Sequence, residues 1–371
     1  MKGVVNSKKR KEVHSVLRRT TPYVILLILP LLVAGCRLGY VLQAANGQYE
    51  ILSESVPLEE GLQSTSLTPD ERRRLRLVPQ IKKFGEEELG LNETENYQAV
   101  YLKSDNPPIY TISASPKDRL TRVTWWFPIV GKMPYLGFFD LEKAKAEKEK
   151  LLKQDLDVII GRAEAYSTLG WFKDPVTLNL IKGTELELVE TIIHEMTHTT
   201  LYVKGQGEFN EGLALLIGKM GALSFFEKNY GHDHPFTLEA RKSIQDERIF
   251  SPFLKSVLER LEQLYDSSLT YSDTLKEREK IFAGSLKDFR HLEKKLQTGR
   301  FIPFGSRKLN NAYLMAIALY HRHFSLFEAV YRENGSDVRK TIIFLQGLSD
   351  NQDDLLVQIQ KWLEERGART S

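Results

Sequence analysis

The chain has 371 residues, of which 42% are hydrophobic, and a formal net charge of +3. This length and composition allow one large domain or two small ones with a hydrophobic core. The positive charge is concentrated in residues 1–35, which hold a surplus of six basic residues, so the remainder carries a net charge near −3. That balance, without a nucleic-acid-binding motif, argues against DNA or RNA as a partner.

The N-terminal segment has the pattern of an export signal. Basic residues precede the thirteen uncharged residues from Tyr23 to Gly35, a length typical of a signal peptide and short for a membrane span. The segment ends Leu-Val-Ala-Gly-Cys, and Cys36 is the only cysteine of the chain. This ending resembles the lipobox of bacterial lipoproteins, which implies lipidation of Cys36. The alternative is an uncleaved anchor over the seventeen uncharged residues 20–36. Both interpretations predict a membrane-tethered, extracytoplasmic protein on the periplasmic or outer-membrane side.

The predicted elements change character along the chain. A capping box at Thr68 and Glu71 begins a helix, and β-branched and aromatic runs after it read as strands. In chain order we expect strands at 97–102, 108–114 and 122–130, a helix at 139–154, strands at 157–161 and 165–172, and helices from 184 onward. Strands grouped ahead of helices predict an α+β fold. The expected parts are a signal peptide or anchor (1–35), a tether and linker (36–67), an α/β subdomain (68–183) and a helical subdomain (184–371).

The stretch HEMTH at residues 194–198 contains the first candidate metal ligands. A capping box at Thr184 and Glu187 predicts a helix that ends near Gly205. On that helix, His194 and His198 stand one turn apart on one face, where both imidazoles can bind one zinc ion at about 2.0–2.1 Å. Glu195 between them is placed to act as a general base. A chance His-Glu-x-x-His string is expected in roughly one such chain in a hundred.

The third candidate ligand stands thirteen residues past the second histidine, in the sequence Asn210-Glu211-Gly212. A catalytic zinc site with two histidines needs a further protein ligand and an open position. Glu211 is predicted to begin a second helix. If the segment at 203–209 turns the chain back, the two helices run antiparallel and Glu211 faces the histidines. The sequence therefore predicts a two-histidine, one-glutamate zinc site.

HEMTH followed by NEGLA resembles the gluzincin peptidases, whose pattern is HExxH, a spacer, and NExxA. The wider sequence resembles a family of bacterial lipoproteins described as predicted aminopeptidases. That resemblance is carried by GYVLQAANGQ, WWFPIVGKMPYLGFFD, AYSTLGWFKDPV, HEMTHTTLYVKGQGEFNE and LNNAYLMAIALY. It implies a zincin-like fold, with a small mixed sheet packed on the active-site helix. The chain departs from the family pattern at Met196-Thr197, at Gln206 and at Gly218, where the family has HELAH, an acidic residue and a glutamate.

The resemblance and the zinc chemistry together imply roles for further residues. A zinc-activated water would hydrolyse the peptide bond, with Glu195 as general base. Gluzincins also supply a hydroxyl or imidazole donor to the oxyanion from a later helix, and Tyr320 is the candidate. The alternative for Tyr320 is a core aromatic, and His321 and His323 are alternative donors, each of which is also expected at the surface.

Peptide recognition is assigned to the strand that directly precedes the active-site helix. In zincins such an edge strand pairs with the extended substrate, and here it would place Tyr166, Ser167 and Thr168 along the cleft. An aminopeptidase must also hold a free α-amine, and Glu164 and Glu208 are the acidic residues closest to the motif. An endopeptidase, a non-catalytic zinc-fold lipoprotein that binds or scaffolds other proteins, and a hydrolase of non-peptide amides remain alternatives.

Overall fold

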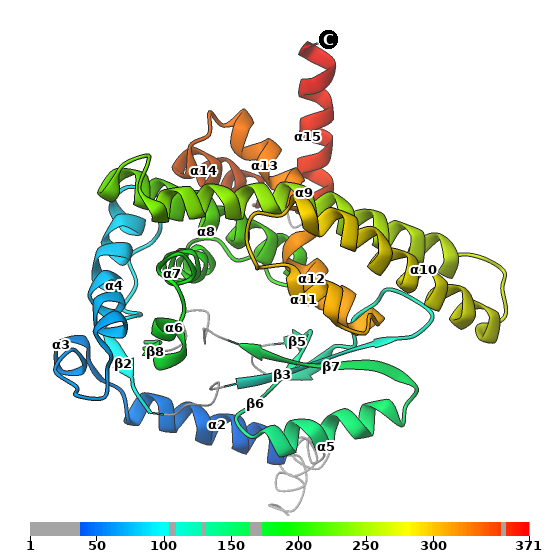
Figure 1. Cartoon of the computed structure of the whole chain (residues 1–371), viewed down its shortest axis with the longest axis horizontal. Helices are drawn as coiled ribbons and strands as arrows, with labels where there is room; N and C mark the ends of the chain where they lie inside the picture. The colour runs from blue at the N-terminus through cyan, green and yellow to red at the C-terminus, as the bar shows by residue number, and fades with distance from the viewer. Residues whose placement is uncertain (1–37, 104–108, 128–130, 164–172, 350–353, 371) are drawn as a thin grey trace, which may run out of the picture. The chain divides into compact units, whose positions relative to one another are not determined.

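The computed structural model describes residues 38–103, 109–127, 131–163, 173–349 and 354–370 (Figure 1). The chain divides into two compact units, Met1–Ile51 and Leu52–Ser371. The described part of the first unit belongs to helix α2 (Leu38–Ser53). The second unit holds the other elements and all the candidate metal ligands. Within the described ranges, no helix combines the length and the apolar character that crossing a membrane requires.

The described strands form three small sheets in the first half of the second unit. In the first, β2 (Ala99–Tyr101) pairs antiparallel with β1 (Val56–Pro57) and parallel with β8 (Val176–Thr177). In the second, β3 (Ile109–Pro116) pairs antiparallel with both β6 (Leu136–Phe138) and β7 (Leu156–Ala163). A two-stranded ribbon joins β4 (Trp125–Phe127) and β5 (Gly131–Met133). The strands predicted at 97–102, 108–114 and 157–161 are confirmed with shifted ends, and 165–172 lies outside the described residues.

The antiparallel sheet has helices as its main neighbours. Its strands contact α5 (Leu141–Leu152) and α12 (Asn311–His321), and the helix predicted at 139–154 is confirmed as α5. The side chain of Asp140 caps α5 by accepting the backbone N–H groups of Glu142 and Lys143. The sequence predicted that the sheet packs on the helix that carries the histidines. Instead, this sheet supports α12, the helix that carries Tyr320.

The remaining elements of the second unit are helical, as the sequence predicts from residue 184 onward. They are α3 (Leu58–Gly61), α4 (Pro69–Glu87), α6 (Leu178–Lys182), α7 (Glu185–Thr200), α8 (Gly207–Tyr230), α9 (Pro235–Tyr265), α10 (Tyr271–Leu292), η1 (Glu293–Lys295), α11 (Ile302–Ser306), α13 (Phe324–Glu333), α14 (Val338–Ser349) and α15 (Leu355–Thr370). The order of strands followed by helices confirms the α+β class.

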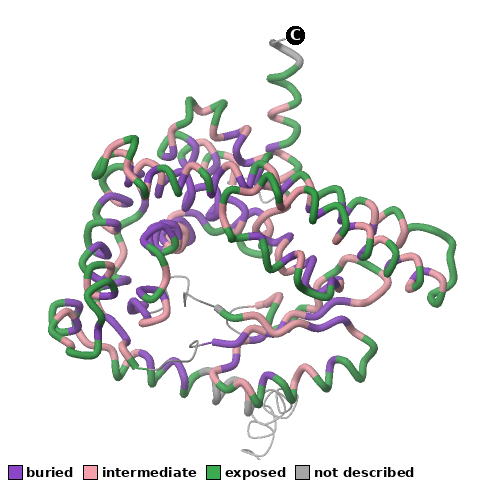
Figure 2. Tube along the Cα trace, viewed as in Figure 1, coloured by how far each residue is buried: buried purple, intermediate pink, exposed green. Residues whose placement is uncertain are grey.

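Helices α7 and α8 lie in the core of the second unit, and Figure 2 shows buried residues along both of them. Leu188, Ile192 and Ile193 of α7 are fully buried, as are Leu213 and Leu216 of α8. Burial of each such side chain contributes about 1.5–3 kcal/mol to folding. Helices α4, α9, α12 and α13 contact α8 from other sides. The candidate metal ligands therefore stand on two helices that are packed in the core.

Candidate metal centre

Helix α7 carries His194, Glu195 and His198. Its start is the predicted capping box, in which the Thr184 hydroxyl accepts the Glu187 N–H and the Glu187 carboxylate accepts the Thr184 N–H. The predicted stop at Gly205 is wrong. The helix ends at Thr200, because Leu201 adopts an extended backbone with φ of −143° and ψ of 111°. Both histidines lie within the last two turns of α7.

The structure brings His194, His198 and Glu211 together. The two Nε2 atoms are 3.1 Å apart, and Glu211 Oε2 lies 3.2 Å from that of His194 and 3.5 Å from that of His198. The side chains are 15%, 4% and 20% exposed, respectively. Burial disfavours the Glu211 carboxylate, but its contacts with both imidazoles hold its pKa well below the usual range. Burial on its own lowers the pKa of His198. The contact with Glu211 raises this pKa by more, so the net pKa lies above the ordinary value for histidine.

The donor geometry fits a tetrahedral zinc ion. Four ligands at 2.0–2.1 Å around zinc are separated from one another by about 3.3 Å. The three observed separations, 3.1, 3.2 and 3.5 Å, bracket that value. Two imidazoles and one carboxylate are also the donor types that catalytic zinc sites use, with a fourth position left open. These residues can therefore hold zinc without a rearrangement of the backbone.

Asn210 fixes the short connection that returns the chain to the histidines. Its side-chain oxygen accepts the Val203 N–H and its amide donates to the Val203 carbonyl, both at 2.8 Å. Gly205 supplies the positive φ of 85° that the turn requires. Helix α8 begins at Gly207, so the predicted start at Glu211 is wrong by four residues. Glu211 consequently faces the histidines from the second turn of α8.

Gly218 marks a close approach of the two helices. A Cβ at this position would lie 2.8 Å from the backbone oxygen of Glu190 and 3.4 Å from the Cβ of His194. Glu211 lies beside His194 and His198, whereas Gly218, two turns later on α8, lies close to Glu190, which precedes both histidines on α7. This order confirms the antiparallel arrangement of α7 and α8. The glutamate that the family pattern has here would clash with the α7 backbone. The close packing of α7 against α8 therefore requires glycine at position 218.

We expect Gly218→Ala to lower the free energy of unfolding by about 1–3 kcal/mol. The added Cβ would force α7 away from α8 and so move Glu211 relative to the two histidines. Gly284→Ala in α10 is the matched control, since no atom lies within 4 Å of its added Cβ. There alanine should raise stability by about 0.5–1 kcal/mol through helix propensity. Chemical denaturation of both metal-free variants gives the comparison, and a Gly218→Ala protein as stable as the wild type would contradict the close packing.

Tyr320 lies beside the three donors. Its ring centroid is 6.1 Å from that of His194, and α12 is held in place by Asn310, whose side chain caps the helix at the Tyr313 N–H. The negative charge of Glu211 raises the pKa of the Tyr320 hydroxyl well above its ordinary value, and burial raises it further. The phenol therefore keeps its proton near neutral pH and can donate a hydrogen bond in the site.

The alternative donors and one candidate amine ligand are already paired. His321 Nδ1 lies 2.9 Å from Glu247 Oε2, and His323 Nε2 lies 2.8 Å from Glu208 Oε2. Their side chains are 16% and 23% exposed, so both histidines are partly buried where the sequence predicted exposed surface residues. Arg122 donates to Glu208 at 3.0 Å. Burial opposes the charged form of Glu208, but His323 and Arg122 lower its pKa to about 2. Glu208 is thus an internal ion-pair partner.

Three residues near the site had no assigned role in the sequence. Arg122 also donates to the Met315 carbonyl and so links α8 to α12. The ring centroid of Tyr202, 46% exposed, is 6.2 Å from that of His198; its place four residues after the histidine was a usable signal.

Tyr97 is 3% exposed with φ of 62°, and its hydroxyl has no hydrogen-bond partner among the described residues. Burial and the charge of Glu195 raise its pKa. Nothing local in the sequence marks Tyr97.

Several predicted site residues lie outside the described residues. They are Cys36, Glu164, Tyr166, Ser167 and Thr168. The expected lipidation and the expected pairing of substrate with a strand at 165–172 therefore stay predictions. Of the residues assigned to the metal and to catalysis, all have described positions.

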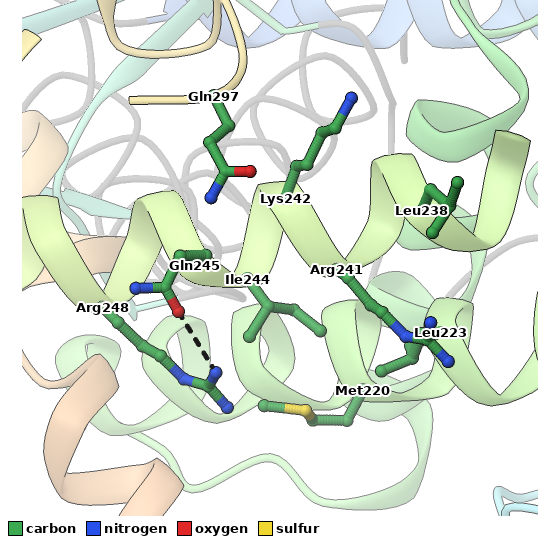
Figure 3. Close-up of a pocket in the computed structure, with 9 residues that line it drawn as sticks. All are labelled: Met220, Leu223, Leu238, Arg241, Lys242, Ile244, Gln245, Arg248 and Gln297. Carbon is green, nitrogen blue, oxygen red and sulfur yellow. Dashed lines mark hydrogen bonds between the residues drawn. The ribbon is translucent and has the colours of Figure 1, made fainter. Parts of the chain in front are cut away.

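One surface hollow is separate from the metal donors. It has a volume of about 540 Å³ and is lined by residues of α8 and α9 together with Gln297 (Figure 3). Met220 and Ile244 lie along it, whereas Arg241 and Arg248 are each ion-paired with a glutamate. None of the three donors lines this hollow. The candidate site is therefore identified by the convergence of His194, His198 and Glu211 and not by the volume of a cavity.

An α+β chain with two imidazoles, a carboxylate and an adjacent glutamate around one point has the type of site found in metal-dependent hydrolases. The model of the family described as "Putative aminopeptidase" matches residues 39–355, so the chain belongs to this family. This match confirms the resemblance to that aminopeptidase family. No curated protein and no solved structure gives a significant match.

Proposed function

We propose that this protein is a zinc-dependent aminopeptidase with a zincin-like fold of the gluzincin type. The observation that carries the proposal is the convergence of His194, His198 and Glu211 at separations of 3.1–3.5 Å, with Glu195 next to the first histidine. The description of the family supports peptide hydrolysis and an amino-terminal preference. Peptides are therefore the proposed substrates.

The metal would be held by Nε2 of both histidines and by the Glu211 carboxylate. When bound, zinc supplies a Lewis acid that polarises the scissile carbonyl and lowers the pKa of a water to about 7. Glu195 accepts the proton of the attacking water and passes it to the leaving amine, so one carboxylate is first base and then acid. The protonated hydroxyl of Tyr320 donates a hydrogen bond to the oxyanion that develops on the substrate carbonyl.

The amino-terminal preference requires an acidic group for the free α-amine. Glu208 is a poor candidate, because Arg122 and His323 already neutralise its charge. Glu164 lies outside the described residues. An endopeptidase is therefore the second candidate. The pairing of Glu208 is the observation that favours it.

The test compares metal-free and zinc-reloaded protein on one peptide with a free N-terminus and on the same peptide with an acetylated N-terminus. An aminopeptidase should bind about one zinc per chain, hydrolyse only in the reloaded form and prefer the free peptide by at least about tenfold, since acetylation removes the charge that the site binds. Equal rates on both peptides would assign an endopeptidase. A protein that neither retains zinc nor cleaves either peptide would refute the enzyme and favour a binding role.

A further inference from the structure

A cluster of buried charges lies among the helices that carry the candidate catalytic groups. We call it the ionic cluster; its members are Glu190 on α7, Lys219 on α8, Ser243 and Glu247 on α9, Arg300 ahead of α11 and His321 on α12. The side chains of Glu190, Lys219 and Glu247 are 7%, 1% and 0% exposed. Charged side chains are almost never so deeply buried unless they are paired.

The contacts of the cluster tie separate segments together. Lys219 Nζ donates to Ser243 Oγ at 2.7 Å and lies 3.4 Å from Glu190 Oε1 and 3.5 Å from Glu247 Oε1. Arg300 donates to the other oxygen of Glu190 at 2.5 Å, and His321 Nδ1 lies 2.9 Å from the other oxygen of Glu247. Each carboxylate is therefore shared between positive or polar groups from different helices.

Net stabilisation does not account for the cluster. Burial favours the neutral acid at Glu247, yet the charges of His321 and Lys219 hold its pKa at about 2, so the carboxylate stays ionised. The free-energy cost of removing such charged groups from water offsets most of their mutual attraction. Apolar side chains of similar volume often stabilise a core at least as well. What a buried ionic network can add is a single permitted alignment of the elements that it joins.

The cluster adjoins the candidate metal centre at three places. Glu190 lies one helical turn before His194 on α7. Lys219 follows Gly218, the point at which α8 meets the Glu190 carbonyl. His321 follows Tyr320 on α12. A shift of α8 along α7 by one residue would move Glu211 by about 1.5 Å, whereas metal ligands tolerate about 0.2 Å.

We propose that the ionic cluster sets the alignment of α7 and α8 and that Lys219 is a positioning residue for the three metal donors. Lys219 stands about two turns after Glu211 on α8, and its polar contacts are with Glu190, Ser243 and Glu247 rather than with the donors. Its contribution is to hold Glu211 at the distance from the histidines at which one zinc ion satisfies all three. This inference rests on the proposed zinc site.

The test measures zinc affinity in Lys219→Met by titration against a competing chelator, at a temperature at which circular dichroism shows a folded protein. Methionine keeps the volume and removes the charge. We expect the zinc Kd to rise by about 10–100-fold, the range that loss of a group supporting a ligand produces. The visible spectrum of the Co²⁺-loaded variant should also change, because it reports ligand geometry. The metal-free Tm should fall, because Glu190 and Glu247 lose a buried partner, so the zinc Kd is compared only between folded proteins.

Two further variants make the result decisive. Lys219→Met combined with Glu190→Gln restores the charge balance, so it should fold even if the single variant does not, and it should still bind zinc weakly. Arg278→Met is the matched control: Arg278 and Asp157 form another buried pair, 2.9 Å apart and each 8% exposed, between α10 and β7. Its loss should lower stability and leave the zinc Kd unchanged.

Unaltered zinc affinity in both Lys219 variants overturns the positioning role. An equal loss of affinity in Arg278→Met overturns it too, because the effect would then reflect general loosening of the core. A wild-type protein that binds no zinc overturns the proposed function itself and this inference with it. The wild-type measurement thereby separates the two failures.

Discussion

Replacement of Glu195 by glutamine is expected to lower kcat/KM for a peptide substrate by about 10²–10⁴-fold while the zinc Kd stays at the wild-type value. Glutamine has nearly the same size and still accepts a hydrogen bond, but it cannot accept the proton of the attacking water. The side chain lies next to His194 on α7 and is not one of the three donors. A general base outside the metal coordination should separate catalysis from metal binding in this way.

The test requires two measurements, one of catalysis and one of zinc affinity. Initial rates on the free peptide give kcat/KM, and titration with a chelator gives the zinc Kd for the same preparations. Glu142→Gln, whose side chain is 77% exposed on α5, is the handling control and should match the wild type in both values. A Glu195→Gln protein that retains full activity would remove Glu195 from the mechanism. One that loses zinc as well would make it a structural support of the ligands.

Local sequence signals predicted the helix that carries the histidines. The capping box at Thr184 and Glu187 and the spacing of apolar residues act within a few residues of each other, so the start of α7 and its buried face could be read from the chain. The class of fold could also be read from the order of strand and helix patterns along the chain. The three donors could be identified because the sequence HEMTH and the following Asn-Glu-Gly lie close together. Short-range chemistry was thus predictable.

The features that align the site come from side-chain contacts that the spacing of residues did not reveal, and several of these join distant segments. Asn210 binds the Val203 backbone and ends the predicted continuation of α7, because its two hydrogen bonds favour an extended connection over further helix. Lys219 interrupts an apolar run and reads as an exposed face, yet its partners stand at Glu190, Ser243 and Glu247. Sequence spacing contains no information about such pairs.

The partial burial of His321 and His323 was not predictable for the same reason. His321 is the last residue of α12 and His323 immediately precedes α13, and imidazoles at helix ends are usually exposed. Their partners Glu247 and Glu208 lie on α9 and α8, more than 70 residues away. The pattern of charges on a single helix cannot reveal a carboxylate that folding brings from another helix.

Glu211→Gln is expected to abolish the stabilisation that zinc gives the wild-type protein. A ligand that binds only the folded state at 100 times its Kd raises the free energy of unfolding by about 2.7 kcal/mol. Glu211 supplies the only carboxylate among the three donors, and loss of a mere supporting group already weakens zinc by about 10–100-fold. Loss of the ligand itself should weaken zinc further, so the Tm of Glu211→Gln should hardly respond to zinc.

Glu208→Gln is the matched control for this prediction. Glu208 stands one turn earlier on α8, its side chain is 23% exposed against 20% for Glu211, and it is also paired with a histidine. Its replacement should lower the Tm of the metal-free protein, because Arg122 and His323 lose their partner. The upward shift of Tm on zinc addition should remain. Thermal unfolding of both variants with and without zinc separates a metal ligand from a buried ion-pair partner; a full zinc shift in Glu211→Gln would exclude Glu211 as a ligand.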